Sequence, residues 1–158
     1  MAVSYIPEGC STVTPHLVCL GASKAIDFYK KAFDAVEMMR MPGPDGQTIM
    51  HAEIKIGDST VFVVDQFPSE HLASPQKLGA TTVGMHLYVK DCDALFNQAV
   101  AAGAKVTMPL MNMFWGDRFG KVIDPFGHEW AIATHVEDVP PAEMGKRMAE
   151  AMKQMGNK

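Results

Sequence analysis

The sequence is poor in the features that mark several large classes of protein. It has three cysteines among 158 residues. Because none stands in a CxxC pair or at a zinc-binding spacing, neither a disulfide framework nor a cysteine-based zinc site is expected. No apolar stretch approaches the roughly 20 residues that cross a bilayer. The N-terminal stretch MAVSYIPEGCSTV lacks the basic segment and long apolar segment of a secretory signal. We therefore expect a cytoplasmic protein with reduced thiols.

Positive charge is also scarce. Fourteen Lys and Arg residues against eighteen Asp and Glu residues give a formal net charge of -4, and the basic residues form no run. Nucleic acid and anionic membranes are therefore not expected as partners. Hydrophobic residues make up 47% of the chain, which is typical of a globular protein rather than a disordered one.

Methionine, in contrast, is abundant. Thirteen methionines are present, and many of them gather in EMMRMPG (37–43) and VTMPLMNMF (106–114). Methionine side chains are flexible and polarisable, so these clusters suit either an adaptable apolar ligand pocket or the gaps of a packed core. The sequence leaves both interpretations open.

The chain contains an internal repeat. TPHLVCLGASKAIDFYKKAF (14–33) and GMHLYVKDCDALFNQAVAAG (84–103) each predict a strand, a short turn and an amphipathic helix, the first helix with a Ser23 cap. Each half is too short to bury its sheet well alone, so two βαβββ halves are expected to share one core and enclose a cleft. The strands expected after the two helices are 36–41, 49–56 and 60–65, then 105–108, 119–123 and 128–134.

These patterns predict an α+β protein with a single domain over residues 1–158. The first βαβββ module covers 10–66, the linker 67–82, the second module 83–135 and a helical tail 136–158. Such a tail must pack on its own domain or on a second chain, because methionines recur on one face of its helix. With the open sheets, this stripe predicts a two-fold homodimer. The striped methionines are Met144, Met148, Met152 and Met155.

Near the end of the second module, FWGDRFGKVIDPFGHEWAIATH (114–135) predicts a β-hairpin. Asp, Pro and Gly in the DPFG stretch (124–127) supply the turn, and the flanking residues suit half-buried strands. The inward-facing residues of this hairpin are expected to form a wall of the cleft.

The βαβββ repeat, the IDFYKKAF helix and the DPFGHEW hairpin together resemble the vicinal oxygen chelate superfamily. That superfamily includes glyoxalases, extradiol dioxygenases, fosfomycin-resistance transferases and bleomycin-binding proteins. MPGPDG, HAEIKIGDS, HLYVKDCDA and the PPAEM tail are similar to its PhnB-like branch. The resemblance implies the glyoxalase/bleomycin-resistance fold, but one fold hosts many chemistries. Members have carried a methyltransferase label, which this sequence does not support, because no Gly-rich cofactor loop follows a strand.

In metalloenzymes of the superfamily, the ligands come from the first and last strand of each half. The matching positions here are Thr14, Gly84 and the neighbourhoods of Val63 and Ala131. None of these residues is a usual ligand of a divalent metal. The resemblance therefore implies that the ordinary metal site is absent.

Three nearby residues offer a substitute ligand set. His16 and His86 lie two residues further along the first strands, and Glu129 lies two residues earlier on the last strand. All three therefore share the face of the lost ligands, and with open positions they would suit Zn, Mn, Fe or Ni. The alternative is that the histidines are hydrogen-bonded core residues and Glu129 is a rim charge.

Two further groups are candidates for the cleft. His51 and Glu53 share one strand face and could act as a general acid and base, or they could form a polar face toward solvent. Trp115 could stack on a ligand and Arg118 could hold an anionic one, unless Asp117 and Arg118 pair on a solvated loop. The expected ligand contacts are Tyr88, Trp115, Asp117 and Arg118.

Two functions remain open at this point. The leading one is a binding module of the glyoxalase/bleomycin-resistance type, which holds a small organic ligand between methionine and aromatic walls without the usual metal site. The alternative is a metal-dependent lyase, isomerase or dioxygenase-type enzyme that uses His16, His86 and Glu129. In such an enzyme a divalent ion would polarise a carbonyl or stabilise an enolate.

Overall fold

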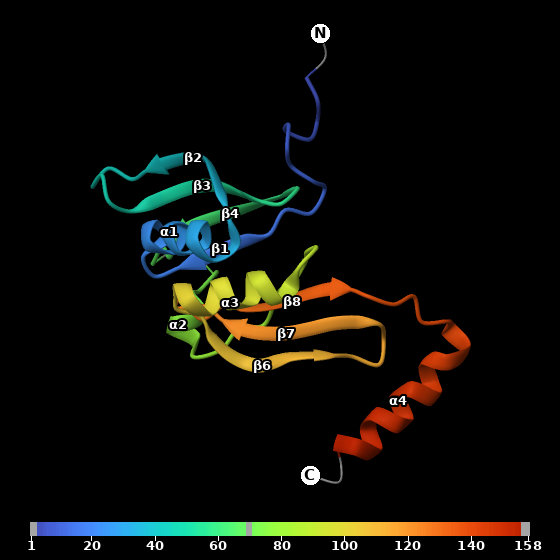
Figure 1. Ribbon diagram of the computed structural model, residues 1–158. Coiled ribbons are helices and arrows are strands. Elements are labelled where there is room, and N and C mark those ends of the chain that lie inside the picture. Colours follow the sequence, from blue (N-terminus) through green and yellow to red (C-terminus); the bar gives the residue numbers. More distant parts are fainter. Residues whose placement is uncertain (1–2, 69–70, 156–158) are drawn as a thin grey trace.

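The computed structural model describes residues 3–68 and 71–155. It shows two four-stranded sheets with helices packed against them (Figure 1). The predicted α+β fold, with two βαβββ modules and a C-terminal helix, is confirmed, and one additional short helix lies within the predicted linker. In chain order the elements are β1 (His16–Cys19), α1 (Ala22–Phe33), β2 (Val36–Pro42), β3 (Ile49–Ile56), β4 (Ser59–Asp65), α2 (Pro75–Leu78), β5 (Gly84–Tyr88), α3 (Cys92–Ala102), β6 (Lys105–Asn112), β7 (Asp117–Ile123), β8 (Glu129–His135) and α4 (Pro141–Met155).

The two sheets have the same topology. The strand order is β1-β4-β3-β2 in the first sheet and β5-β8-β7-β6 in the second. The first strand of each module pairs in parallel with the last, and the other pairs are antiparallel. As a result, β1 and β5 are edge strands of their sheets.

The N-terminus of α1 is capped by a carboxylate that lies far along the chain. The backbone N–H groups of Gly21 and Ala22 both donate to Oδ1 of Asp65, over 2.9 and 2.8 Å. A negative charge at this end complements the helix dipole. The predicted Ser23 cap is wrong, because Ser23 lies inside the first turn and its hydroxyl accepts a hydrogen bond from Arg40.

The two modules share one hydrophobic core around their helices. α1 and α3 pack on each other, and Trp130 of β8 packs on Tyr29 and Phe33 of α1, with ring centroids 5.3 and 4.5 Å apart. One buried cluster therefore includes residues of both helices and both sheets. Both helices lie at the junction of the two sheets (Figure 1). Each sheet thus has one helix-covered face and one outer face, and the outer faces point away from the shared core.

The DPFG turn ties the modules together through one buried carboxylate. Asp124 accepts hydrogen bonds from the hydroxyl of Tyr29 at 2.8 Å and from Nε1 of Trp130 at 2.9 Å. It also accepts from the backbone N–H groups of Phe126 and His128. A buried charge is stable only when its hydrogen bonds are satisfied, and four donors from both modules satisfy this one.

The C-terminal helix leaves the body of the protein. Figure 1 shows α4 projecting away from both sheets. Met148 and Met152 are 45% and 58% exposed, while the side chain of Met155 lies outside the described part of the structure. The described methionine face of α4 is therefore largely uncovered in a single chain. None of the helices described here is both long and apolar enough to cross a membrane.

Candidate ligand-binding site

The outer face of the second sheet carries a continuous aromatic surface. Strand alternation directs His86 and Tyr88 of β5 outward, and each lies in register with an alanine of β8. The ring centroids of His86 lie 4.5 Å from Tyr88 and 5.7 Å from Phe119, and Trp115 lies 5.6 Å from Phe119. We call these four residues, His86, Tyr88, Trp115 and Phe119, the aromatic surface. Because the neighbouring alanines are small, the rings have room to lie side by side.

A buried carboxylate fixes two rings of the aromatic surface. Asp117 is 3% exposed at its side chain. Its Oδ2 accepts from the hydroxyl of Tyr88 and from Nε1 of Trp115, both at 2.9 Å, and its Oδ1 pairs with Nδ1 of His135 at 2.8 Å. Both oxygens are therefore engaged, so Asp117 positions the aromatic rings rather than contacting a ligand itself.

The same contacts set the protonation of this cluster. Burial raises the pKa of Asp117, but the hydrogen bonds from His135, Tyr88 and Trp115 outweigh it and hold the pKa below its ordinary value. The hydrogen bond to Asp117 raises the pKa of the Tyr88 hydroxyl. Bonds to Asp138 and Asp117 raise the pKa of His135. The favoured state is thus a carboxylate with donors on every side.

Arg118 does not belong to the aromatic surface. Its guanidinium pairs with the carboxylate of Asp93 on α3, over 2.5 Å from Nε to Oδ2 and 2.6 Å from Nη2 to Oδ1. Arg118 therefore lies on the opposite face of β7 from the aromatic surface. β7 begins at Asp117, and successive residues of a strand point to opposite sides. The alternative Asp117–Arg118 pair does not form either, since Asp117 pairs with His135.

The outer face of the first sheet carries the predicted acid–base pair. Nε2 of His51 lies 3.3 Å from Oε1 of Glu53. The ring of Phe62 lies 4.7 Å from His51 and 6.2 Å from His16. The register places Met39 opposite Glu53 and Met41 opposite His51, so both methionines share the face of this pair. This face therefore combines apolar side chains with one histidine–carboxylate pair.

The substitute metal ligands are not gathered within one chain. His16 lies in the first sheet, whereas His86 and Glu129 lie in the second, and Oε1 of Glu129 bonds to Nζ of Lys121 at 2.8 Å. Residues 3–68 and 71–155 contain no group of three His, Cys, Asp or Glu side chains placed to hold a metal. Val63, counted above as a ligand position, is fully buried in the shared core. The described residues of a single chain therefore do not form a site for the divalent ion that metalloenzymes of the superfamily hold.

The buried thiol of Cys19 is not a candidate nucleophile. Burial, with the nearby charge of Asp124, raises its pKa to about 12. Because the thiolate is the reactive form of cysteine, a thiol with this pKa is inert near neutral pH.

The sequence patterns did not identify some residues of the two outer faces. Phe62, Phe119 and His135 all contact predicted site residues. The signal was available in part, because Phe119 lies two positions from Asp117 on one strand and so shares its face. Nothing local connects Phe62 with His51, which come from different strands.

Comparison with known proteins assigns this architecture to a family. The model of the Glyoxalase/Bleomycin resistance protein/Dioxygenase superfamily matches residues 17–132. The chain belongs to this superfamily. That match ends before α4 begins, so the C-terminal helix lies outside the part of the chain that the family model describes.

Individual relatives of this superfamily member agree with the assignment. A protein of unassigned function from Mycobacterium bovis is 45% identical over 152 residues, which is 94% of this chain and 97% of the relative. The crystal structure of TioX from Micromonospora sp. ML1 has 26% identity and a TM-score of 0.62, and it covers 80% of this chain and 99% of TioX. A PhnB protein from Bacillus cereus has 18% identity and a TM-score of 0.61, and the match covers 78% of this chain and 99% of that protein. At 18% identity this last likeness shows the fold alone.

Proposed function

We propose that this glyoxalase-superfamily protein binds a small organic ligand with a flat, partly aromatic body, in the cytoplasm. The observation that carries the proposal is the aromatic surface, whose Tyr88 and Trp115 rings are already oriented by Asp117. Aromatic side chains held in place lose little conformational freedom when a ligand stacks on them. Methionines on the outer faces supply adaptable apolar contacts around such a ligand.

A second copy of the chain supplies the opposite wall of the cleft. In one chain the two outer faces point away from the shared core, so neither covers the other. A two-fold dimer that opposes the first sheet of one copy to the second sheet of the other would bury both faces and build two equal clefts. Each cleft would place Met39, His51 and Phe62 of one copy over the aromatic surface of its partner.

A metal-dependent enzyme is the second candidate. His16 stands on the edge strand β1 and His86 on the edge strand β5, both on outer faces. Opposed sheets of two copies would bring these edges together, with His51 and Glu53 as a nearby acid–base pair. Metal analysis of protein purified without a histidine tag, before and after dialysis against a chelator, separates this candidate from the binding module.

Titration with N-phenyl-1-naphthylamine, a neutral flat aromatic probe, tests the proposed binding function. Replacing Tyr88 with Ala should weaken binding of this probe by about tenfold, because one aromatic contact is worth up to about 1.5 kcal/mol. Tyr88 is 64% exposed, so the melting temperature should change little.

The matched control is Tyr5→Ala, at a tyrosine that is 95% exposed and lies outside both sheets. This variant should bind the probe as the unaltered protein does. Equal losses in the two variants, or no loss in Tyr88→Ala, would contradict the proposed site.

A further inference from the structure

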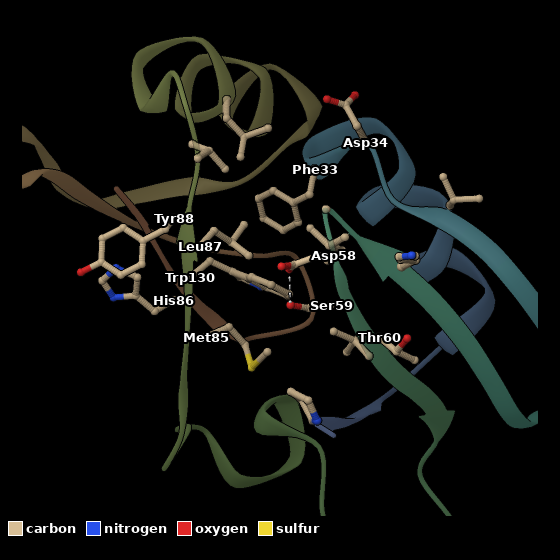
Figure 2. A pocket seen from close by; sticks show the side chains of 18 of the residues that line it. Phe33, Asp34, Asp58, Ser59, Thr60, Met85, His86, Leu87, Tyr88 and Trp130 are labelled. Atoms are coloured by element: carbon tan, nitrogen blue, oxygen red, sulfur yellow. Dashed lines mark hydrogen bonds between the residues drawn. The ribbon is translucent and has the colours of Figure 1, made fainter. Parts of the chain in front are cut away.

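A hollow lies between the modules, along the edge strand β5. Its volume is about 940 Å³, which is within the usual size range of pockets for small organic molecules. Figure 2 shows it between the free edge of β5, the end of α1 and the turn that joins β3 to β4. Two residues expected at a site from the sequence, His86 and Tyr88, also line this hollow, but its acids and its apolar floor were not expected.

The floor of this hollow is apolar. Phe33 from α1 and Leu87 from β5 lie close together in Figure 2, and Leu95 of α3 completes the floor. Trp130 supports it, with its ring centroid 4.5 Å from that of Phe33. Because these side chains already pack in the shared core, the floor is preformed and gives a ligand an apolar surface to cover.

The rim of the hollow is acidic. Among the described residues, three carboxylates, Asp34, Asp58 and Asp91, border it, together with the ammonium group of Lys55. Oδ1 of Asp34 accepts from Gln98, Oδ1 of Asp58 from Ser59, and Oδ1 of Asp91 from the N–H of Ala94. Among the described residues, the second oxygen of each carboxylate has no hydrogen-bond partner and none of the three forms a salt bridge.

We propose that the hollow between the modules binds an organic cation with an apolar body, such as a quaternary ammonium compound with an aromatic or alkyl arm. The apolar arm lies on the floor of Phe33, Leu87 and Leu95, and the cationic head lies among the rim carboxylates. His86 and Tyr88 of the aromatic surface also line the hollow. Its floor and its acids are not part of that surface, so this site goes beyond the proposed function.

The acids can be neutralised without disturbing the backbone. Asp34 has a φ of 53°, a left-handed conformation that asparagine tolerates well. Asp91 caps α3, a role in which asparagine is equally good. Asp58 follows Gly57 in a turn, where asparagine also fits. The triple variant Asp34→Asn, Asp58→Asn, Asp91→Asn therefore removes charge alone.

The experiment titrates the full chain with three probes: phenylpropyltrimethylammonium, its neutral isostere with carbon in place of nitrogen, and the anion phenylbutyrate. The methyl NMR signals of Leu87 and Leu95 report binding in the hollow, and the methyl signals of Ala131 and Ala133 report the outer face. The cation should shift the leucine signals and bind most tightly. In the triple variant its affinity should fall about tenfold, to that of the neutral probe, since exposed ion pairs are individually weak.

Two further variants complete the test. Ala94→Phe, at an exposed lining position of α3, should block the hollow for the cation and the neutral probe alike. Asp27→Asn, at an exposed acid of α1 away from the hollow, should change nothing. The proposal is overturned if cation and anion bind equally or if the leucine signals do not shift. It is also overturned if Ala94→Phe changes the oligomeric mass, since the hollow would then be a contact between copies. Shifts confined to Ala131 and Ala133 would overturn it while supporting the proposed function.

Discussion

At the residue scale, two buried aspartates accept hydrogen bonds for different purposes. Asp124 joins donors from both modules inside the core. Asp117 holds two exposed aromatic rings and a histidine of the outer face. The same side chain thus serves the fold in one place and shapes the candidate site in the other, and the difference comes from what its donors are attached to.

Replacing Asp124 with Ala should lower the free energy of unfolding by at least about 3 kcal/mol, because it leaves the Tyr29 hydroxyl, the Trp130 N–H and two backbone N–H groups buried without an acceptor. Urea unfolding measures the change. Asp45→Ala is the matched control, because Asp45 also accepts several hydrogen bonds but lies in an exposed turn. Similar losses in both variants would show that Asp124 does not join the modules.

At the element scale, the start of the C-terminal segment is clamped to the second sheet. His135, the last residue of β8, bonds to Asp117 of β7 and to Asp138 of the segment that leads to α4. Gly116, with a φ of 98°, accepts hydrogen bonds from the N–H groups of Val136 and Glu137. A β-carbon at Gly116 would lie 2.0 Å from the carbonyl oxygen of Glu137, so only glycine fits. The direction in which the tail leaves the body is therefore fixed at residues 135–138.

This clamp should weaken as the pH rises. Asp138 and Asp117 raise the pKa of His135 above its ordinary value of 6.5. Its contribution to stability is therefore fully present below about pH 6.5 and is lost as the pH rises through the folded-state pKa. The pKa of Asp117 is lowered. Its contribution to stability is therefore present above the ordinary pKa of an aspartate and is lost as the pH falls through the folded-state pKa. NMR titration of the His135 ring should give a pKa above 6.5, and amide exchange at Val136 and Glu137 should quicken as His135 loses its proton.

The variant Asp138→Asn tests the cause of this shift. It removes one acceptor charge from His135 and should bring its pKa back toward 6.5, whereas Asp27→Asn should leave it unchanged. A pKa of His135 at or below 6.5 in the unaltered protein would contradict the clamp.

The sequence predicted the helices and strands better than it predicted which side chains share one face of a sheet. The two βαβββ modules followed from periodicity, and Tyr88, which was expected as a ligand contact, lies in the aromatic surface. Arg118 was expected beside Trp115 because the strand was predicted to begin at residue 119, whereas β7 already begins at Asp117. The cap of α1 could not be predicted, since its acceptor, Asp65, lies far along the chain. Which side of each sheet the helices cover also depends on tertiary packing that no local pattern encodes.

At the scale of the whole molecule, the proposed ligand cleft requires two chains. Its helices share one core, and its outer sheet faces, rich in methionine and aromatic residues, point away from that core. The uncovered methionine face of α4 adds to the apolar surface that a single chain leaves exposed. Exposed apolar patches of this kind mark association surfaces. The central claim is therefore that the ligand cleft forms between the first sheet of one copy and the second sheet of another.

Mixing two variants tests this claim most directly. Met39→Glu damages the first-sheet wall, and Tyr88→Ala damages the second-sheet wall, so each variant alone should bind N-phenyl-1-naphthylamine poorly. When the two are unfolded and refolded together, half of the dimers should contain one chain of each kind. Each mixed dimer has one cleft with both walls intact, so about one quarter of all clefts should regain the original affinity. If the mixture regains no sites, each cleft lies within one chain and the account is contradicted.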